Sequence, residues 1–599
     1  MSCNRPLVLL VQLPIPLPGH EPVRGNIPLA AGYLKLFARR QGLENRYVID
    51  ILPMPLANTL GDQGLIEEIL GREPWMVGFT CYLWNVDRTL WLAERLKQCR
   101  PEMHIVLGGP EITADNAYVL GRSAVDCAVI GEGEQTFAEL LRVLDGRAAT
   151  GAPEAVSIDG LWQRGRWQVR PRRPLETLDE IGSPYLEGIL NVADEGAMYL
   201  ESVRGCAFRC KFCYYPRGYD AICYLSSESL LAVLRHAAQH GANEVVLLDP
   251  TLNQRKDFAE FVGLLGRGNT GGRMGFFGEL RAEAIAPPTA RLMADANFTE
   301  VEVGLQTTNQ KAQTLMQRHN DLEAFERGVR AMLDAGIRVK VDLIVGLPGD
   351  TAQSVRRSID YLHKNRLYST VQVFNLSILP GTAFRREADR LGLHYQRVPP
   401  YFVLHTPTLA LDEMYSLVEE AQDAFGIEYD PCSSPVLDFP AETPGPVCCA
   451  RIDLDAGSWS LPCASKRAQA FTLWLRSGDF RARQDSANFL LRQLLDDNPH
   501  TTLQVVLEPT ARPESLNAAV LEGLLATCYQ TTSYLDRFYS MHPDELRGAK
   551  RLIVVVREAE RGRLGRRWAQ AVGNYATLMW LPEHSRTIGG KMFAHPYSA

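Results

Sequence analysis

Three cysteines in this chain lie close enough together to share one inorganic centre. Cys206, Cys210 and Cys213 have the spacing Cys-x3-Cys-x2-Cys. Thiolates are soft ligands that suit iron–sulfur clusters. Three of them can hold three irons of a cubic 4Fe–4S cluster and leave the fourth iron open. The spacing therefore predicts an iron–sulfur cluster with one iron free to bind a small molecule.

A zinc site is the main alternative for the same cysteines. Structural zinc takes four protein ligands, usually as two cysteine pairs. The nearest further cysteine, Cys223, comes ten residues after Cys213, and no nearby histidine completes a set of four. An iron–sulfur cluster is therefore favoured over zinc.

Repeated strand–helix units must position these cysteines. Strands are expected near Met198, Val245, Phe276, Val301, Val339 and Val371. Helices are expected over residues 230–240, 257–265, 289–295, 324–334 and 352–363. Such a series predicts a partial (β/α)6 barrel, in which active sites lie at the carboxyl ends of the strands. The cysteines directly follow the first strand, so they are expected at that end.

The cysteine spacing and the barrel together resemble the radical S-adenosylmethionine (SAM) superfamily. The aromatic Phe212 just before the last cysteine is also typical of that family. In the family, SAM chelates the open iron, and one electron from the cluster can cleave SAM to a 5′-deoxyadenosyl radical. The resemblance implies a 4Fe–4S cluster and SAM as cofactors, and an external electron donor of the flavodoxin or ferredoxin type.

Later strand ends resemble the SAM-binding segments of that family. Asp249 stands where the family contacts the SAM amino group or ribose, and Gln306 ends the fourth strand. Arg318 follows as a partner for the SAM carboxylate, unless it is a solvated helix residue. Gly346 and Pro348 belong to a GxPGxT-like segment that supports the adenine and sugar. The resemblance implies that these residues bind SAM.

Two opposite charges end the third barrel strand. Glu279 and Arg281 are both expected to face the site, where they would act in catalysis. A structural ion pair at the barrel rim is the alternative. A carboxylate such as Glu279 could also cap the open iron, which would favour polar over radical use of SAM.

Residues 1–145 show a second, separate alternation of strands and helices. Strands are expected over residues 7–13, 47–52, 75–81, 104–107 and 125–130, and helices over 29–40, 86–97 and 136–144. This order is typical of a doubly wound parallel sheet, whose ligands bind beyond the carboxyl ends of the strands. The residues at those ends are Thr80, Cys81, Tyr82, Gly108, Gly109, Pro110, Gly131, Glu132 and Gly133.

The glycine-rich turns after the fourth and fifth of these strands resemble those of the cobalamin-binding domain of B12-dependent radical SAM proteins. Residues 108–110 match its GGP-like turn and residues 131–134 its GEGE-like turn. No Asp-x-His-x-x-Gly motif is present, so the resemblance implies cobalamin bound without a histidine on cobalt. The alternative is that the glycines only form tight turns in a Rossmann-like domain that binds nothing.

The rest of the chain completes an expected α/β architecture. Residues 1–145 form the Rossmann-like doubly wound domain, 146–190 a linker with a hairpin over 161–167, and 191–400 the barrel. Residues 401–599 are expected to form a C-terminal α/β or α+β domain that shapes the substrate pocket, with a helix over 411–425 and strands over 503–507 and 552–556. Its four clustered cysteines fit no metal pattern and are interpreted as buried structural residues. They are Cys432, Cys448, Cys449 and Cys463.

The bulk composition narrows the class of protein. The 599 residues are enough for several domains, and 46% hydrophobic with 22% charged residues is ordinary for a globular protein. A net charge of -7 argues against nucleic acid as a partner. No apolar run is long enough for a membrane helix, and the short run at 7–13 lacks the features of a signal peptide. The 13 cysteines do not resemble a disulfide framework. A cytoplasmic monomer that acts on a small molecule is expected.

The two resemblances together imply a cobalamin-dependent radical SAM methyltransferase. Such an enzyme moves a methyl group from SAM through methylcobalamin to a carbon of a small-molecule or amino-acid-derived substrate in antibiotic biosynthesis, with C2 of tryptophan as one candidate acceptor. An alternative keeps both cofactors but performs a rearrangement, a cyclisation or carbon–heteroatom bond formation. A non-enzymatic cobalamin or redox sensor is disfavoured, because the three cysteines and the later motifs are intact.

Overall fold

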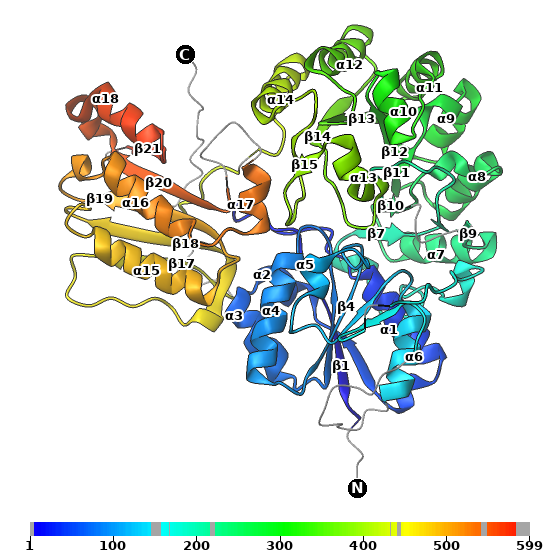
Figure 1. Cartoon of the computed structure of the whole chain (residues 1–599), viewed down its shortest axis with the longest axis horizontal. Helices are drawn as coiled ribbons and strands as arrows, with labels where there is room; N and C mark the ends of the chain where they lie inside the picture. The colour runs from blue at the N-terminus through cyan, green and yellow to red at the C-terminus, as the bar shows by residue number, and fades with distance from the viewer. Residues whose placement is uncertain are drawn as a thin grey trace.

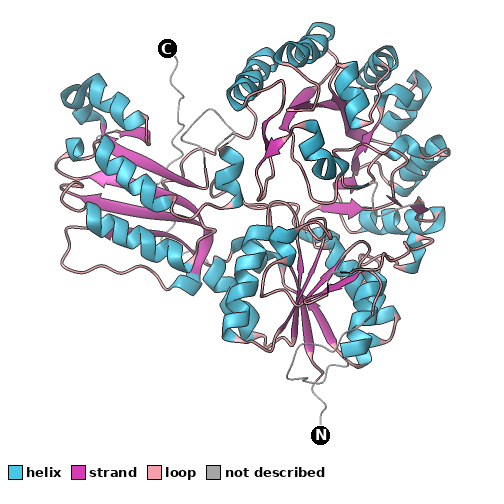
Figure 2. Cartoon of the chain, viewed as in Figure 1, coloured by secondary structure: helices cyan, strands magenta, loops and turns pink. Residues whose placement is uncertain are grey.

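The chain folds into three α/β modules, each built on its own sheet of wholly or mostly parallel strands (Figure 1). The computed structural model describes residues 5–144, 157–166, 168–215, 222–431, 433–439, 445–540 and 548–582. Figure 2 shows strands inside every module and helices around them. Within these ranges, no helix combines the length and apolar character needed to cross a membrane.

The first module is a six-stranded sheet with helices on both faces. Its strands are β1 (Leu7–Gln12), β2 (Val48–Ile51), β3 (Met76–Thr80), β4 (His104–Gly108), β5 (Cys127–Val129) and β6 (Leu161–Gln163), in the order β2-β1-β3-β4-β5-β6. Its helices are α1 (Leu29–Arg40), α2 (Met54–Thr59), α3 (Asp62–Gly71), α4 (Val86–Cys99), α5 (Ala117–Leu120) and α6 (Glu134–Leu144). Along β1, Val8 and Leu10 pack in one core while Leu9 and Val11 pack in the other. Burial of both sheet faces explains the continuous apolar strands and confirms the doubly wound prediction.

Residues 146–190, expected to be a linker, also contribute a strand to the first sheet. Strand β6 from this region pairs antiparallel with β5 and extends the first sheet. Gln163 also bridges Arg166, which agrees with the hairpin, although Trp167 lies outside the described residues. Leu161 and Trp162 are buried in the first module, so their apolar side chains draw this segment into its core.

The second module is an open barrel of six parallel strands, as predicted. The strands are β7 (Ala197–Leu200), β10 (Glu244–Leu247), β11 (Gly275–Leu280), β12 (Phe298–Gln306), β13 (Arg338–Val345) and β14 (Thr370–Asn375), and they pair in chain order. The helices α7 (Ser227–Gln239), α8 (Phe258–Gly268), α9 (Pro287–Asp295), α10 (Gln310–Met316), α11 (Leu322–Asp334) and α12 (Ala352–Asn365) follow these strands in turn. Figure 1 shows them around the outside of the barrel.

A short antiparallel pair closes the base of the cysteine loop. Strand β8 (Val203–Arg204) pairs with β9 (Cys223–Tyr224), with Arg204 opposite Cys223. Residues 205–215, the described part of the loop that carries the three cysteines, directly follow β8. Because Cys223 is buried in the closing pair, it belongs to the base of the loop.

The third module is a five-stranded parallel sheet, which makes it α/β. Its strands are β17 (Val447–Asp453), β18 (Arg467–Ser477), β19 (Thr502–Pro509), β20 (Lys550–Arg557) and β21 (Thr577–Leu581), paired in chain order. Its helices are α15 (Gln484–Asp497), α16 (Ala518–Cys528), α17 (Tyr534–Tyr539) and α18 (Arg561–Gly573). The strands expected over 503–507 and 552–556 are the centres of β19 and β20.

The connection between the second and third modules contains α13 (Ala383–Leu391), β15 (His394–Tyr395), β16 (Val403–His405) and α14 (Leu411–Phe425). Helix α14 packs against α12 and β14. The barrel module therefore extends through α14, beyond the boundary expected at residue 400.

The cysteines of the tail do not form one buried group. Cys448 and Cys449 are half-buried at the start of β17, and Cys463 is exposed. Cys432 lies outside the described residues. The interpretation as buried structural cysteines is therefore wrong for Cys463, which stands on a surface loop before β18.

Candidate functional site

The cysteine loop lies at the carboxyl end of the first barrel strand and is held by backbone contacts. The Ala207 amide donates to Gln254 Oε1 at 2.8 Å, and Gln254 Nε2 donates to the Gly205 carbonyl at 3.1 Å. The Lys211 amide donates to the Met316 carbonyl at 2.9 Å, next to α10. These contacts place the loop across the end of the barrel.

Cys206, Cys210 and Cys213 are near enough to affect one another electrostatically. Burial is the main cause that raises the pKa of Cys213 to about 12, and the neighbouring Cys210 and Cys206 raise it further. Within the described residues, no three His, Cys, Asp or Glu side chains are arranged to hold a metal ion. The fit to an iron–sulfur cluster therefore rests on the donor set, which is three soft thiols on one loop.

Asp249 binds the residues that directly precede the cysteine loop. Its Oδ1 accepts hydrogen bonds from the amides of Ser202 (2.7 Å) and Val203 (3.0 Å), and its Oδ2 accepts one from the Ser202 hydroxyl. The side chain is 1% exposed, and burial raises its pKa to about 6. Both oxygens accept hydrogen bonds from the residues just before the cysteine loop, so Asp249 can position that loop. The expected contact with SAM stays a prediction.

Gln306 and Arg318 meet at the carboxyl end of β12 with unused hydrogen-bonding atoms. Gln306 has a left-handed backbone conformation (φ +66°), is 8% exposed, and its Oε1 has no partner. Arg318 follows the end of α10 and donates to the Gly304 carbonyl, while its Nε is buried without a partner. Asn320 Oδ1 is likewise unpaired. Buried polar atoms normally have partners, so this strand end fits a polar ligand, and Arg318 is no solvated helix residue.

Gly346 and Pro348 are both buried in the segment after β13. Gly346 has φ +94°, and a Cβ there would stand 3.2 Å from Met414 Sδ on α14. Asp350 fixes the same segment by accepting from Asn309 Nδ2 (2.9 Å) and from the Ser354 hydroxyl (2.6 Å). This segment can present its backbone, rather than side chains, to a ligand.

Glu279 and Arg281 do not form the rim ion pair that was one alternative. Arg281 donates to the His319 carbonyl at 3.0 Å, and its nearest carboxylate is that of Glu283 at 3.6 Å. Its guanidinium lies 4.3 Å from the ring centroid of Phe208, between Cys206 and Cys210 in the chain. Arg281 therefore packs against the cysteine loop by a cation–π contact.

Glu279 belongs to a row of charged side chains inside the barrel. It lies opposite Glu302 in the strand register, and Glu302 lies opposite Lys340, whose Nζ is 3.0 Å from Glu302 Oε2. Glu279 is exposed by surface area, but desolvation by the protein around it, followed by the charge of Glu302, raises its pKa to about 7. Asp342, two residues beyond Lys340 and therefore on the same face of the strand, has a pKa raised well above its ordinary value by burial and by Glu302.

Sequence reasoning missed Glu302, Lys340 and Asp342. The signal was present, because charged residues alternate with apolar ones along β12 and β13. Such a period of two places the charged residues on one face of a strand. The direction of that face, into the barrel, depends on the helices that cover the other side.

The carboxyl ends of the first sheet open into a cavity of about 370 Å³. A Cβ at Gly108 or Gly131 would meet no atom within 4 Å, so both turns leave open space. Gly109 and Gly131 have positive φ angles of 106° and 86°, which favour glycine. The cavity is also lined by Thr80, Tyr82, Pro110, Glu132 and Gly133, together with apolar residues of α1 and the strands. This set fits a large ligand with an apolar part, as cobalamin is.

Cys81 is the exception among the predicted cavity residues. It is fully buried, and its amide donates to the Gly108 carbonyl at 2.7 Å. A Cβ on Gly109 would stand 2.6 Å from the Cys81 carbonyl oxygen. Cys81 therefore packs behind the glycine turn and, unlike Thr80 and Tyr82, does not line the cavity.

A buried ion network joins this cavity to the cysteine loop. Arg204, at the base of the loop, lies 3.1 Å from Glu132 and 2.8 Å from Glu134, and 3.0 Å from Glu201 of the barrel. Tyr214 and Tyr215, directly after Cys213, line the same cavity. The cysteine loop is thus part of the cavity wall, and two sites predicted independently face each other.

Family comparisons agree with both halves of this arrangement. The description "B12 binding domain" matches residues 26–141, and "Radical SAM superfamily" matches residues 200–362. The chain therefore contains a B12-binding domain and a radical SAM domain. The assignment confirms the expected cofactors, which are a 4Fe–4S cluster, SAM and cobalamin.

Curated relatives of this chain include methyltransferases and a cyclase. The 2-(S-pantetheinyl)-carbapenam-3-carboxylate methyltransferase of Streptantibioticus cattleyicolor is 25% identical over 65% of this chain and 58% of its own length. The cobalamin-dependent radical SAM methyltransferase TokK of Streptomyces tokunonensis has the same identity and coverage. The anaerobic magnesium-protoporphyrin IX monomethyl ester cyclase of Rubrivivax gelatinosus is 27% identical over 57% of this chain and 62% of its length. The chain spans less than two thirds of each of these relatives.

Solved structures confirm the fold. The radical SAM methyltransferase TsrM of Kitasatospora setae, with tryptophan and a SAM analogue bound, superposes with a TM-score of 0.53 at 18% identity, over 65% of this chain and 77% of that one. The cobalamin-dependent radical enzyme OxsB superposes with a TM-score of 0.56 at 15% identity, over 69% of this chain and 66% of that one.

Proposed function

We propose that this protein is a cobalamin-dependent radical SAM methyltransferase that methylates a carbon of a small-molecule or amino-acid-derived substrate in antibiotic biosynthesis. One observation carries the proposal. Tyr214 and Tyr215, which follow the last cysteine, form part of the wall of the cavity at the carboxyl ends of the first sheet. Groups held by the cysteine loop and by that cavity would be neighbours, as a transfer between them requires.

The chain's own residues divide into three sets by the group they would hold. Cys206, Cys210 and Cys213 would bind the cluster. Gln306, Arg318, and the backbone of the segment with Gly346 and Pro348 would bind SAM. Thr80, Tyr82, Gly108, Gly109, Pro110, Gly131, Glu132 and Gly133 would line the cobalamin site. When bound, these cofactors supply reductive SAM cleavage and methyl relay, chemistry that reaches carbons inert to ordinary nucleophilic methylation.

The residues around these sites would orient the reactants and exclude water. Asp249 and Arg281 hold the cysteine loop in place by the contacts described above. Glu279 is exposed to solvent and has a pKa raised to about 7, so it can take or give a proton near neutral pH. It lies on β11, in the same row as Glu302 and Lys340. We assign Glu279 the role of proton acceptor from the substrate.

The deciding experiment is anaerobic purification followed by analysis of iron, sulfide, cobalt and SAM products. S-adenosylhomocysteine together with a substrate heavier by one methylene supports methyl transfer. Formation of 5′-deoxyadenosine without S-adenosylhomocysteine would refute it.

A second candidate function is a non-methylating reaction with the same cofactors. The similarity to the magnesium-protoporphyrin cyclase, the highest in identity of the three relatives above, favours considering ring closure. A product that has lost hydrogens and gained no methyl group would support this candidate.

The partners follow from the same proposal. An external flavodoxin- or ferredoxin-type protein would deliver electrons to the cluster, and the mildly acidic chain would act as a cytoplasmic monomer. Reduction of the cluster by reduced flavodoxin, followed by electron paramagnetic resonance, tests the donor. Size-exclusion chromatography with light scattering tests the monomer.

A further inference from the structure

A second cavity lies between the first and third modules. It has a volume of about 290 Å³. One wall is the proline-rich segment between β1 and α1, including Pro14, Ile15 and Leu17, and another is the start of α4 with Trp84 before it. The third module contributes the amino ends of β18, β19 and β20 and the start of α17. None of these residues belongs to the cofactor cavity described above.

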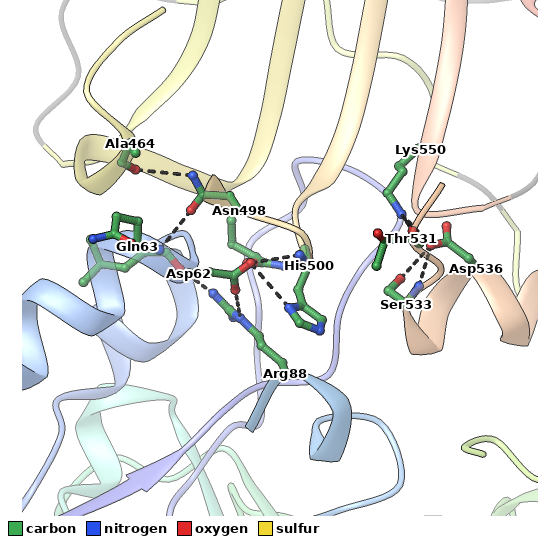
Figure 3. A network of polar contacts seen from close by, with 12 residues as sticks. Asp62, Gln63, Arg88, Ala464, Asn498, His500, Thr531, Ser533, Asp536 and Lys550 are labelled. Carbon is green, nitrogen blue, oxygen red and sulfur yellow. Dashed lines mark hydrogen bonds and ion pairs between the residues drawn. The ribbon is translucent and has the colours of Figure 1, made fainter. Parts of the chain in front are cut away.

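The charged side chains beside this cavity are already paired (Figure 3). Asp62 lies 2.6 Å from Arg88 Nε and accepts from the His500 amide at 2.8 Å. On the other side, Lys550 lies 2.6 Å from Asp536. Burial alone would raise the pKa of Asp62, but the charge of Arg88 holds it well below its usual range.

The remaining ionisable groups of the wall leave no buried charge for a ligand. Asp87 accepts from the Tyr118 hydroxyl at 2.5 Å and contacts Arg537. Burial, with the charge of Arg551, lowers the pKa of His20 to about 4, so its ring is neutral at pH 7. Glu21 is exposed at the rim. A charged ligand would lose its hydration without gaining a counter-charge.

Two polar atoms of the wall, Gln469 Oε1 and His500 Nδ1, have no hydrogen-bond partner. His500 Nδ1 still lies 3.5 Å from the Asp62 carboxylate, so Gln469 Oε1 is the atom that a ligand can satisfy. Gln469 is 8% exposed, and its Nε2 donates to the His500 carbonyl. Its Oε1 has no hydrogen-bond partner. A buried amide oxygen without a partner carries a desolvation cost that a ligand N–H or O–H would remove. The rest of the wall is largely apolar, with Pro14, Leu17, Pro22, Val23 and Trp84.

Two aromatic side chains, Trp84 and Tyr82, separate this cavity from the cofactor cavity of the first sheet. The Trp84 ring stacks on Tyr82 at a centroid distance of 4.6 Å and an interplanar angle of 5°. Tyr82 lines the cofactor cavity on the other side. Tyr534 lines both this cavity between the first and third modules, called the interdomain cavity below, and a groove along the open edge of the barrel at β14. A molecule that enters the groove at β14 therefore has this cavity behind Tyr534.

We propose that the interdomain cavity binds the non-reacting arm of the substrate, and that this arm is neutral, largely apolar, and donates one hydrogen bond to Gln469 Oε1. The assignment of the ligand as a substrate rests on the proposed function. The binding itself is independent of the chemistry, because no residue of the cavity holds a cofactor.

Calorimetric titration of the anaerobic, cofactor-loaded full chain with hexanamide tests the binding. Hexanamide has a neutral apolar chain and an N–H donor, and hexanoate is its charged counterpart. We expect hexanamide to bind and hexanoate to bind at least tenfold more weakly. Ala470→Phe, which fills the cavity, should abolish binding, and Gln469→Met should weaken it about threefold to tenfold. Ala511→Phe, an exposed site after β19, is the matched control and should change nothing.

Chain length separates a substrate arm from an independent effector. If the passage at Tyr534 leads to the groove, decanamide should bind at least as tightly as hexanamide. A sharp loss of binding with the longer amide would show a closed effector site and overturn the assignment. Absence of hexanamide binding, equal binding of hexanoate, or full binding by the Ala470→Phe variant would overturn the site itself.

Measurement of SAM cleavage in the same samples distinguishes failure of this inference from failure of the proposed function. A wild-type protein that binds hexanamide but never cleaves SAM would contradict the proposed function and leave the cavity as a binding site. A protein that cleaves SAM but binds no amide would contradict only the cavity assignment.

Discussion

Replacement of Asp249 by alanine should loosen the cysteine loop and leave the cobalamin cavity intact. The amides of Ser202 and Val203 would lose their acceptor in a buried place. An unsatisfied buried donor costs about 1–3 kcal/mol, so the total loss in free energy of unfolding is roughly 2–6 kcal/mol. Iron content should fall with the free energy of unfolding, since these two residues lie directly before the cysteine loop.

Asp249→Asn is the matched comparison. Its carbonyl oxygen can still accept from both amides, and the charge that burial disfavours is removed. The raised pKa, about 6 against an ordinary 3.8, corresponds to about 3 kcal/mol of cost for the charged form. We therefore expect Asp249→Asn to be as stable as the wild type, or more stable, at pH 8.

The pH dependence has a definite sign. Between pH 4 and 6 the folded wild type holds a proton on Asp249 that the unfolded chain has released. This group therefore makes stability fall as pH rises through that window. Asp249→Asn should remove that contribution.

Urea denaturation across pH, iron analysis and cobalamin absorbance form the assay. Asp249→Ala should lose iron but retain cobalamin, and Asp249→Asn should retain both. If Asp249→Asn kept normal iron and stability but lost SAM binding, Asp249 would contact SAM directly. The positioning role would then be refuted.

Three further perturbations test the other parts of the site. Arg204→Met leaves the carboxylates of Glu132, Glu134 and Glu201 without their shared cation, and should cost about 3–5 kcal/mol at pH 8. Burial raises the pKa of Glu201 to about 7. The loss in free energy of unfolding, measured by urea denaturation, should therefore be smaller at pH 5.5 than at pH 8. An equal loss at both pH values would contradict this account. Gly131→Val places a side chain where φ is +86° and the cavity is open; cobalamin absorbance should drop at least tenfold with iron unchanged, and normal cobalamin content would show that the turn is not in the site. Cys210→Ala should abolish the iron–sulfur absorbance, whereas the exposed Cys463→Ser control should leave it unchanged; loss in both would point to a second iron site.

Much of the fold could be predicted from local patterns. The period of two and the apolar runs located all six barrel strands, and helices over 29–40 and 411–425 match α1 and α14 at both ends. These patterns act over a few residues, and burial on one or both faces enforces them. The hairpin expected over 161–167 contains β6, but its place in the first sheet follows only from the pairing with β5.

The site divides in the same way. The spacing of Cys206, Cys210 and Cys213 is a covalent property of the chain, so the sequence by itself determined the kind of cluster they suit. The surroundings of Asp249 and Cys81 depend on residues that are distant in the chain. Only the tertiary structure decided that the Asp249 carboxylate faces the amides of Ser202 and Val203, and that Cys81 packs behind Gly109.

The carboxylate row and the interdomain cavity belong wholly to the tertiary structure. Strand register brings Glu279 opposite Glu302, and the cavity joins Trp84 to Gln469 across nearly 400 residues of chain, ~385 by position. Motif spacing reports which atoms can bind a metal. The packing of three modules decides which buried atoms are left without partners, and those atoms carry the substrate proposal.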